Sequence, residues 1–211
     1  MKSELVGRDP REIRLVAVTK TVEVDRIEEA IAEGVNIIGE SRVQEAKEKY
    51  GKVESKIIWH LVGHLQRNKA KDAVKLFDLI HSVDSAKLAK EIDKQARKIG
   101  KIQKILIEVN VSGEKSRYGL NPEEVIAFLQ EVSVLPHVKI EGLMTIAPLG
   151  ENPEDCRPYF RKLKELGEGV KAEDIENVKM VYLSMGMSND FEVAIEEGSN
   201  MVRIGRAIFG P

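Results

Sequence analysis

The sequence predicts a single α/β domain, residues 1–211, folded as a closed (β/α)8 (TIM) barrel. Three observations support this prediction: eight short apolar runs, helical periodicity between them, and a chain of 211 residues. Divided over eight units, this length leaves about 26 residues for each strand and helix, which is near the lower limit for the fold. We therefore expect short connecting loops and no large insertion.

The predicted strands are short and continuously apolar, which is typical of parallel strands that are buried on both faces. They comprise residues 15–18, 36–39, 57–62, 79–83, 105–111, 140–146, 180–183 and 201–204. Because segments of helical character separate the runs, the pattern predicts a series of parallel βαβ units.

The connecting segments show helical periodicity and recognisable helix ends. Apolar residues at helical spacing recur in residues 24–31 and 88–99, with charged residues between them. A helix is expected to begin at residues 121–124, where Asn can cap, Pro takes the first position and acids follow. Another is expected to open at residues 188–190, run to Glu197 and end at Gly198.

An open, doubly wound sheet is the alternative architecture. Such sheets usually contain about five or six strands, and no G-x-G-x-x-G motif follows the first predicted strand here. The sequence also contains no Gly/Ser-rich or Pro-rich linker and no low-complexity segment. A single domain is therefore the favoured interpretation.

The composition excludes several classes of protein. With 33 Lys and Arg against 35 Asp and Glu, the net charge is −2, so the chain lacks the excess of basic residues that is typical of nucleic-acid-binding proteins. The hydrophobic content of 42% is too high for a disordered chain, and no apolar run reaches the roughly 20 residues of a membrane helix. The N-terminus lacks a signal-peptide core and Cys156 is the single cysteine, so we expect a cytoplasmic protein.

The candidate functional residues follow the predicted strands, because the active face of such barrels lies at the strands' carboxyl ends. They are Thr19, Lys20, Glu40, Ser41, Arg42, His60, Gly63, His64, Ser82, Asn110, Arg117, Met144, Thr145, Ser184, Arg203 and Gly205. His60 and His64 lie in a strand and a turn with no acidic residue between them, so a metal site is not expected.

Lys20 is the most informative of these residues, since it ends the apolar run Val-Ala-Val-Thr-Lys. An amine that is partly desolvated at a strand's end has its pKa lowered toward the neutral, nucleophilic form. Such a lysine is suited to forming a Schiff base with an aldehyde. The alternative is an ordinary solvated lysine, which from this residue alone is the commoner case.

Two motifs near the C-terminus favour an anion or heterocycle as the ligand. Ser-Met-Gly-Met-Ser, residues 184–188, is expected at a strand-to-helix turn, where backbone N–H groups can approach an anion. Arg203 lies within an apolar strand, where a charge needs a partner or a ligand, and Gly205 follows it. Phosphate sites of these barrels often lie after strands seven and eight, where both motifs fall.

Taken together, these motifs resemble those of the pyridoxal-phosphate homeostasis protein family, and the resemblance covers nearly the whole chain. The matching segments are residues 15–20, 38–45, 59–63, 65–69, 82–84, 142–144, 183–188, 202–205 and 208–210. The resemblance implies a barrel of the alanine racemase N-terminal-domain type, with pyridoxal 5'-phosphate (PLP) held at its mouth.

The resemblance also assigns roles to individual residues. Lys20 would carry PLP as a Schiff base, and Arg203 would face the pyridine nitrogen. The phosphate would be held by Ser184, Ser188 and the backbone at Gly205 and Arg206. The complete set of expected cofactor-binding residues is Lys20, Ser41, His60, Asn110, Met144, Ser184, Ser188, Arg203, Gly205 and Arg206. No catalytic and no metal-binding residue is predicted.

The sequence departs from the family pattern at three of the site positions. Ser41 stands where the family usually has Asn, so a ligand contact carried by that amide is in doubt. Arg117 stands in the fifth-strand loop where Lys is frequent, and Arg206 where many members have a small residue. The segment before the first strand is also shorter than is typical.

Three functions are consistent with these residues. The first is PLP binding in cofactor homeostasis, buffering or delivering PLP without robust catalysis. The second is a PLP-dependent amino-acid racemase, which would need a β-rich second domain; because the sequence ends at Pro211, we expect that domain to be absent. The third is a Schiff-base aldolase without PLP, which leaves Arg203 and the serine motif unexplained. The first is preferred, with PLP-dependent apo-enzymes as candidate partners, no nucleic acid or membrane partner, and a monomeric state.

Overall fold

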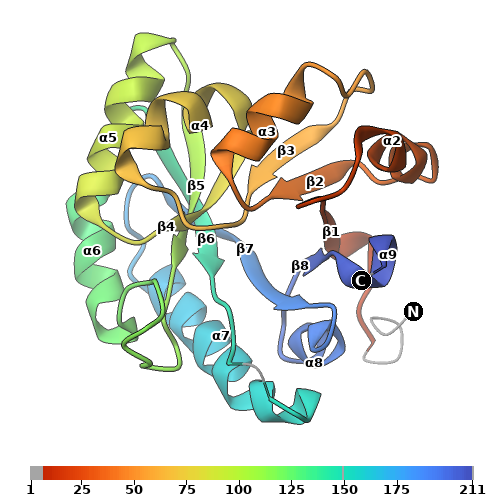
Figure 1. Cartoon of the computed structure of the whole chain (residues 1–211). Helices are drawn as coiled ribbons and strands as arrows, with labels where there is room; N and C mark the ends of the chain where they lie inside the picture. Colours follow the sequence, from red (N-terminus) through yellow and green to blue (C-terminus); the bar gives the residue numbers. More distant parts are fainter. Residues whose placement is uncertain (1–6, 149, 211) are drawn as a thin grey trace.

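The eight apolar runs form eight parallel strands that close into a barrel in the order β1 to β8 (Figure 1). The computed structural model describes residues 7–148 and 150–210. The strands are β1 Arg14–Val18, β2 Ile37–Glu40, β3 Ile58–Leu61, β4 Leu79–Val83, β5 Gln103–Glu108, β6 Val138–Met144, β7 Val178–Met187 and β8 Met201–Ile204. The predicted (β/α)8 architecture is therefore confirmed.

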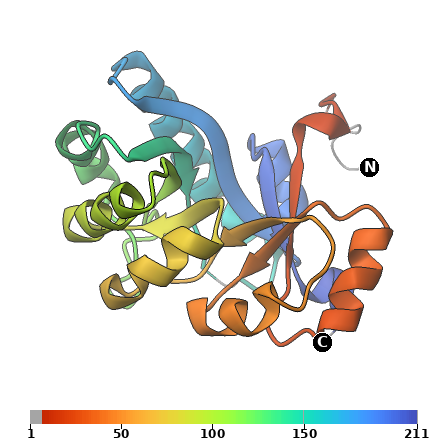
Figure 2. The ribbon, with the colours of Figure 1, turned by 90° about the horizontal axis from the view of Figure 1, so that it is seen from above.

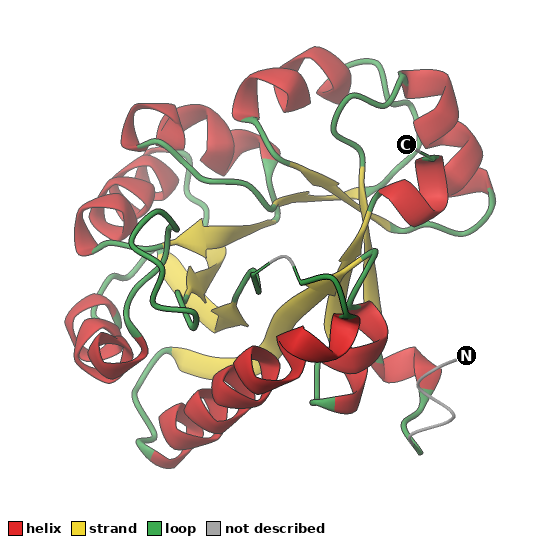
Figure 3. Cartoon of the chain, turned by 60° about the horizontal axis from the view of Figure 1, so that its bottom comes forward, coloured by secondary structure: helices red, strands yellow, loops and turns green. Residues whose placement is uncertain are grey.

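Each strand is followed by a helix, and the helices surround the barrel (Figure 3). They are α2 Val24–Ala32, α3 Val43–Tyr50, α4 Ala70–Leu76, α5 Ala86–Lys98, α6 Val125–Val132, α7 Arg157–Ala172, α8 Phe191–Glu196 and α9 Arg206–Phe209. A 3-10 turn, Pro122–Glu124, precedes α6; Asn121 caps it as predicted and forms a capping box with Glu124. Gly198 follows α8 with a φ of 99°, as its predicted role as a helix terminator requires.

Strand β7 differs most from its prediction. It extends to Met187, so the first four residues of the Ser-Met-Gly-Met-Ser segment end the strand, and the turn toward the next helix begins only at Ser188. Figure 2 shows its full length as the long blue strand. Gly186, with a φ of 92°, lies within a shift of register against β8, which lets the strand continue past Ser184. Helix α8 consequently begins only at Phe191, after Asp190.

The structure contains an outer core and an inner core. The outer core packs the helices against the strands and includes Ile27, Phe77 and Phe160. The inner core fills the barrel and consists of Val16, Ile37, Val62, Leu79, Leu106, Met144 and Met201. The barrel interior is thus a packed layer of side chains and not a pore, so a ligand site has to lie at one of its ends.

Among the described residues, no helix is both long enough and apolar enough to cross a membrane.

Candidate functional site

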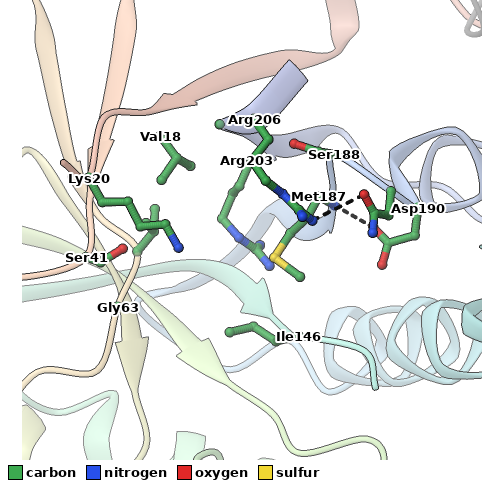
Figure 4. Close-up of a pocket in the computed structure, with 13 residues that line it drawn as sticks. Val18, Lys20, Ser41, Gly63, Ile146, Met187, Ser188, Asp190, Arg203 and Arg206 are labelled. Atoms are coloured by element: carbon green, nitrogen blue, oxygen red, sulfur yellow. Dashed lines mark hydrogen bonds between the residues drawn. The ribbon is translucent and has the colours of Figure 1, made fainter. Parts of the chain in front are cut away.

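A pocket of about 510 Å³ opens at the carboxyl ends of the strands (Figure 4). It is lined by Val18, Lys20, Ser41, Val62, Gly63, Ile146, Met187, Ser188, Asn189, Asp190, Arg203, Gly205 and Arg206. Its volume falls in the range of small-molecule sites, roughly 300–1,000 Å³. The predicted residues Lys20, Ser41, Ser188, Arg203, Gly205 and Arg206 therefore line a single cavity.

Lys20 occupies a turn directly after β1, and its side chain reaches into the pocket (Figure 4). The side chain is solvent-exposed, so the expected partial desolvation of the amine is wrong for this structure. The physical reason is position: the residue lies beyond the strand's end, at the open rim, while Thr19 before it is fully buried. Lys20 is thus accessible to a ligand that enters from solvent.

Arg203 lies on the floor of the pocket and is 4% exposed. One terminal guanidinium nitrogen, Nη1, donates to Ser184 Oγ at 2.6 Å, and the other, Nη2, to the carbonyl oxygen of Thr145 at 2.8 Å. Burial lowers the pKa of Arg203 to about 10, which leaves the guanidinium charged at neutral pH. The expectation that this buried charge needs hydrogen-bond partners is met.

Ser184 and His60 lie inside the barrel, below the pocket, and neither lines it. The Ser184 hydroxyl is 3.0 Å from Nδ1 of His81, whose Nε2 is 3.0 Å from Nδ1 of His60. Burial lowers the pKa of His60 to about 3 and that of His81 well below its usual value, so both rings are neutral. Ser184 is therefore placed as a hydrogen-bond partner of Arg203.

His81 was missed by the sequence reasoning, although the sequence contained a signal. In the strand 79–83, His81 lies two residues after Leu79, whose side chain belongs to the inner core. Side chains alternate between the two faces of a strand, so His81 also faces inward. A titratable residue at an inward position of a barrel strand is a candidate partner for another buried polar group.

The far end of the pocket is rich in hydrogen-bond donors. Ser188 follows β7, and Gly205 precedes the short helix α9. Arg206 is exposed and donates through Nη2 to Asn189 Oδ1 at 3.3 Å, which holds the guanidinium beside the pocket. A Cβ at Gly205 would lie 3.3 Å from the carbonyl oxygen of Val18, so glycine keeps this wall close to β1.

Gly63 and Ser41 form the wall near Lys20 (Figure 4). A Cβ at Gly63 would lie 2.2 Å from the carbonyl oxygen of Ser41, a separation that no side chain can accommodate. The loops after β2 and β3 are therefore in direct backbone contact at the rim. Ser41 contributes to the pocket as predicted, and its backbone carbonyl determines how near the third strand's loop can come.

Met144 and Asn110 do not line the main pocket. Met144 is fully buried in the inner core. Asn110 organises the loop after β5: its Oδ1 accepts from Ser112 Oγ at 2.9 Å and from the Gly113 N–H at 3.0 Å. It also lines a smaller adjoining cavity of about 210 Å³, which shares Ile146 with the main pocket.

Glu108 is a further buried group that the sequence reasoning missed. It ends β5, is 6% exposed, and its Oε2 has no hydrogen-bond partner among the described residues. Burial, reinforced by the charge of Asp84 and opposed by that of Arg203, raises the pKa of Glu108 from 4.5 to about 7. Near neutral pH this carboxyl is therefore close to its titration midpoint.

Glu108 is expected to make stability depend on pH. Its folded-state pKa exceeds the unfolded value, so the folded state binds more protons between pH 4.5 and about 7, and stability falls as pH rises through that window. Glu108→Gln should raise the free energy of unfolding at pH 8 by up to about 3 kcal/mol and change it little at pH 4. Urea unfolding at pH 4 and pH 8 measures the free energy of unfolding of both proteins. The exposed Glu123→Gln is the control, and an equal effect at both pH values would contradict the assignment.

Within residues 7–148 and 150–210, no group of three or more His, Cys, Asp and Glu side chains could hold a metal ion. His60 is hydrogen-bonded to His81, whereas His64 stacks on Tyr118 at a ring-centroid distance of 3.7 Å.

Comparison with known proteins places the chain in a defined class. Residues 5–211 match the family model of the alanine racemase N-terminal domain. Alanine racemase of Clostridium difficile superposes with a TM-score of 0.75 at 17% identity, covering 100% of this chain and 55% of that one, which shows a shared fold.

Two relatives are much more similar. The pyridoxal phosphate homeostasis protein of Aquifex aeolicus is 47% identical over 98% of this chain and 90% of its own length. PipY of Synechococcus elongatus, solved with PLP bound, superposes with a TM-score of 0.88 at 36% identity, covering 99% of this chain and 97% of PipY. The chain belongs to the family of pyridoxal phosphate homeostasis proteins.

Proposed function

We propose that this protein binds PLP at the pocket of β1–β8, on Lys20, and serves in PLP homeostasis by buffering or delivering the cofactor. The observation that carries the proposal is the presence in one cavity of an accessible lysine amine, a buried guanidinium and a group of anion-binding donors. The PLP bound to PipY, at 36% identity, supports the same ligand here.

The chemistry of the lining fits PLP region by region. Lys20 offers an amine to the aldehyde at one side of the pocket. Val18, Val62, Ile146 and Met187 supply apolar walls for the ring. Ser188, Arg206 and the backbone at Gly205 supply donors for the phosphate at the other end. Bound PLP would supply an aldehyde carbon that can pass from one amine to another. The protein's own residues bind and orient the cofactor.

We infer that Arg203 determines how strongly bound PLP can withdraw electrons. Its guanidinium, held by Ser184 and Thr145, is a permanent donor on the pocket floor. A cation facing the pyridine nitrogen keeps that nitrogen unprotonated, which makes the ring a weaker electron sink than a carboxylate partner would. This favours holding PLP over carbanion chemistry and supports a role without robust catalysis. Met144, His60 and Ser184 lie beneath this floor, where they support Arg203 and the walls without lining the pocket.

We further propose that the recipients are PLP-dependent apo-enzymes and that the protein acts as a monomer in the cytoplasm. The single cysteine, Cys156, is a buried free thiol, which is consistent with a reducing compartment.

The proposal is tested by spectroscopy of the purified protein. We expect a visible absorbance band that borohydride reduction removes, with the reduced adduct located on the Lys20 peptide by mass spectrometry. An adduct on another lysine would reject the site. The same sample should show negligible racemisation of common amino acids, and robust Lys20-dependent turnover would replace the homeostasis role with that of a racemase.

A further inference from the structure

Beneath the Lys20 turn lies a buried ionic cluster that the proposed binding site does not itself use. Lys49 of α3 donates to three oxygens: Glu40 Oε1 at 2.9 Å, Glu45 Oε1 at 2.6 Å and the carbonyl oxygen of Thr19 at 2.6 Å. The Lys49 side chain is 10% exposed, and that of Glu40 is completely buried. All three donors of the ammonium group are therefore engaged.

The same cluster holds the backbone on both sides of Lys20. Before it, the Thr19 carbonyl accepts from Lys49, and Thr19 Oγ1 donates to Glu40 Oε1 at 2.7 Å. After it, the Thr21 N–H donates to Glu45 Oε1 at 2.5 Å. Lys49 is bonded to both carboxylates, so a single side chain links the two flanks of the turn.

Thr21 shows why the turn has to be held. Its φ is 61°, a left-handed conformation that is unfavourable for a β-branched residue. Residues in such conformations persist only where the surrounding structure fixes them, and they are concentrated at functional sites. Because β1 fixes the chain before this turn and α2 fixes the chain after it, a relaxation of Thr21 to negative φ would have to be compensated in the neighbouring backbone, Lys20 included.

We propose that Lys49 is a positioning residue that, through Glu40 and Glu45, fixes the strained Thr21 turn and so directs the Lys20 amine into the pocket. The inference rests on the proposed function only in taking Lys20 as the PLP-binding residue. It assigns a role to three charged residues of β2 and α3, none of which lines the cavity.

The test measures the reactivity of Lys20 without PLP. Wild-type protein and Lys49→Met are treated with propanal and cyanoborohydride, and the labelled fraction of the Lys20 peptide is followed by mass spectrometry from pH 6 to 10. Displacement of a reacting group by about 1 Å can cost 100-fold. A bound aldehyde reacts only with a correctly placed amine, so we expect the PLP dissociation constant of Lys49→Met to rise about tenfold or more. The Lys20 labelling rate and its pH profile should change as well, because the surroundings of the amine change.

A matched control and a rescue separate positioning from stability. Lys47→Met, on the same helix, removes an exposed ammonium that pairs with Asp72 at 3.2 Å and should leave labelling and PLP affinity unchanged. Thr21→Gly in the Lys49→Met background should restore PLP affinity at least in part, because glycine adopts positive φ without strain. A purely structural defect would not be relieved, since glycine adds entropy to the unfolded chain.

If Lys49→Met does not fold, Glu45→Ala removes the acceptor of the Thr21 N–H and should weaken PLP binding in the same direction, again relieved by Thr21→Gly. Folded variants with wild-type labelling and wild-type PLP affinity would overturn the inference, as would a defect that Thr21→Gly leaves unrelieved. If wild-type protein fails to bind PLP, the proposed function is rejected, while the propanal labelling still decides the role of Lys49.

Discussion

Lys20→Ala is expected to abolish the visible absorbance of bound PLP while leaving the barrel folded. The side chain is exposed at the pocket rim, so its removal should change the free energy of unfolding by no more than about 0.5 kcal/mol. In the proposed site the substitution removes the amine that would bind the PLP aldehyde, so that only non-covalent contacts would be left. Absorbance spectra, together with thermal unfolding, measure both consequences.

Lys52→Ala is the matched control, because Lys52 is also exposed but does not line the pocket. It should retain the full absorbance band. An unchanged spectrum in Lys20→Ala, at equal protein concentration and PLP supply, would show that PLP is attached elsewhere.

Arg203→Gln should have the largest effect on stability. The substitution withdraws a buried cation from Ser184 Oγ and the Thr145 carbonyl and removes the attraction that partly offsets burial of Glu108. Leaving these groups without their partner should cost about 2–4 kcal/mol of unfolding free energy. Where the variant is folded, the absorbance maximum of bound PLP should shift, because the proposed site places the Arg203 charge at the pyridine nitrogen and the substitution removes it. Urea unfolding and pH-dependent spectra provide the two measurements.

The exposed Arg26→Gln controls for loss of a positive charge and should be neutral. Adding Glu108→Gln to Arg203→Gln should recover part of the lost stability at pH 8, since the carboxylate left behind is then neutral. If the two substitutions are simply additive, Glu108 and Arg203 are not coupled and the electrostatic account of the barrel interior is incorrect. An unshifted spectrum would place Arg203 away from the ring.

Arg203→Glu would destabilise the protein more than Arg203→Gln. It would place a second carboxylate in the interior that already holds Glu108, so the loss of folding would obscure any change in the spectrum. The neutral substitution is therefore the more informative one.

The strands and their order were predictable because a parallel strand buried on both faces has a continuous apolar signature. Strand ends were less predictable. Strand β7 continues past Ser184 because Gly186 adopts a positive φ, and nothing in the local composition distinguishes that conformation from a turn. Six of the ten expected ligand-binding residues line the pocket, since a closed barrel brings its strands' carboxyl ends together whatever the loops contain.

The interior hydrogen bonds were not predictable from the sequence. Arg203, Ser184, His81 and His60 come from four strands, and their contacts depend on the relative heights of those strands in the barrel. A shift of one residue would turn each side chain to the opposite face. Lys20 is exposed because the chain turns directly after β1, and the positive φ of Thr21 in that turn has no signal in the sequence.

The contact between Gly63 and Ser41 has a consequence for variation within the family. At that edge the pocket is shaped by two backbones, since the hydrogen of Gly63 faces the carbonyl of residue 41 whatever side chain residue 41 carries. A substitution such as Ser41→Asn should therefore alter the hydrogen bonds that the wall offers while preserving its shape. The side chain at position 41 can therefore change without moving this wall, whereas any side chain at position 63 would push the two loops apart and reshape the pocket.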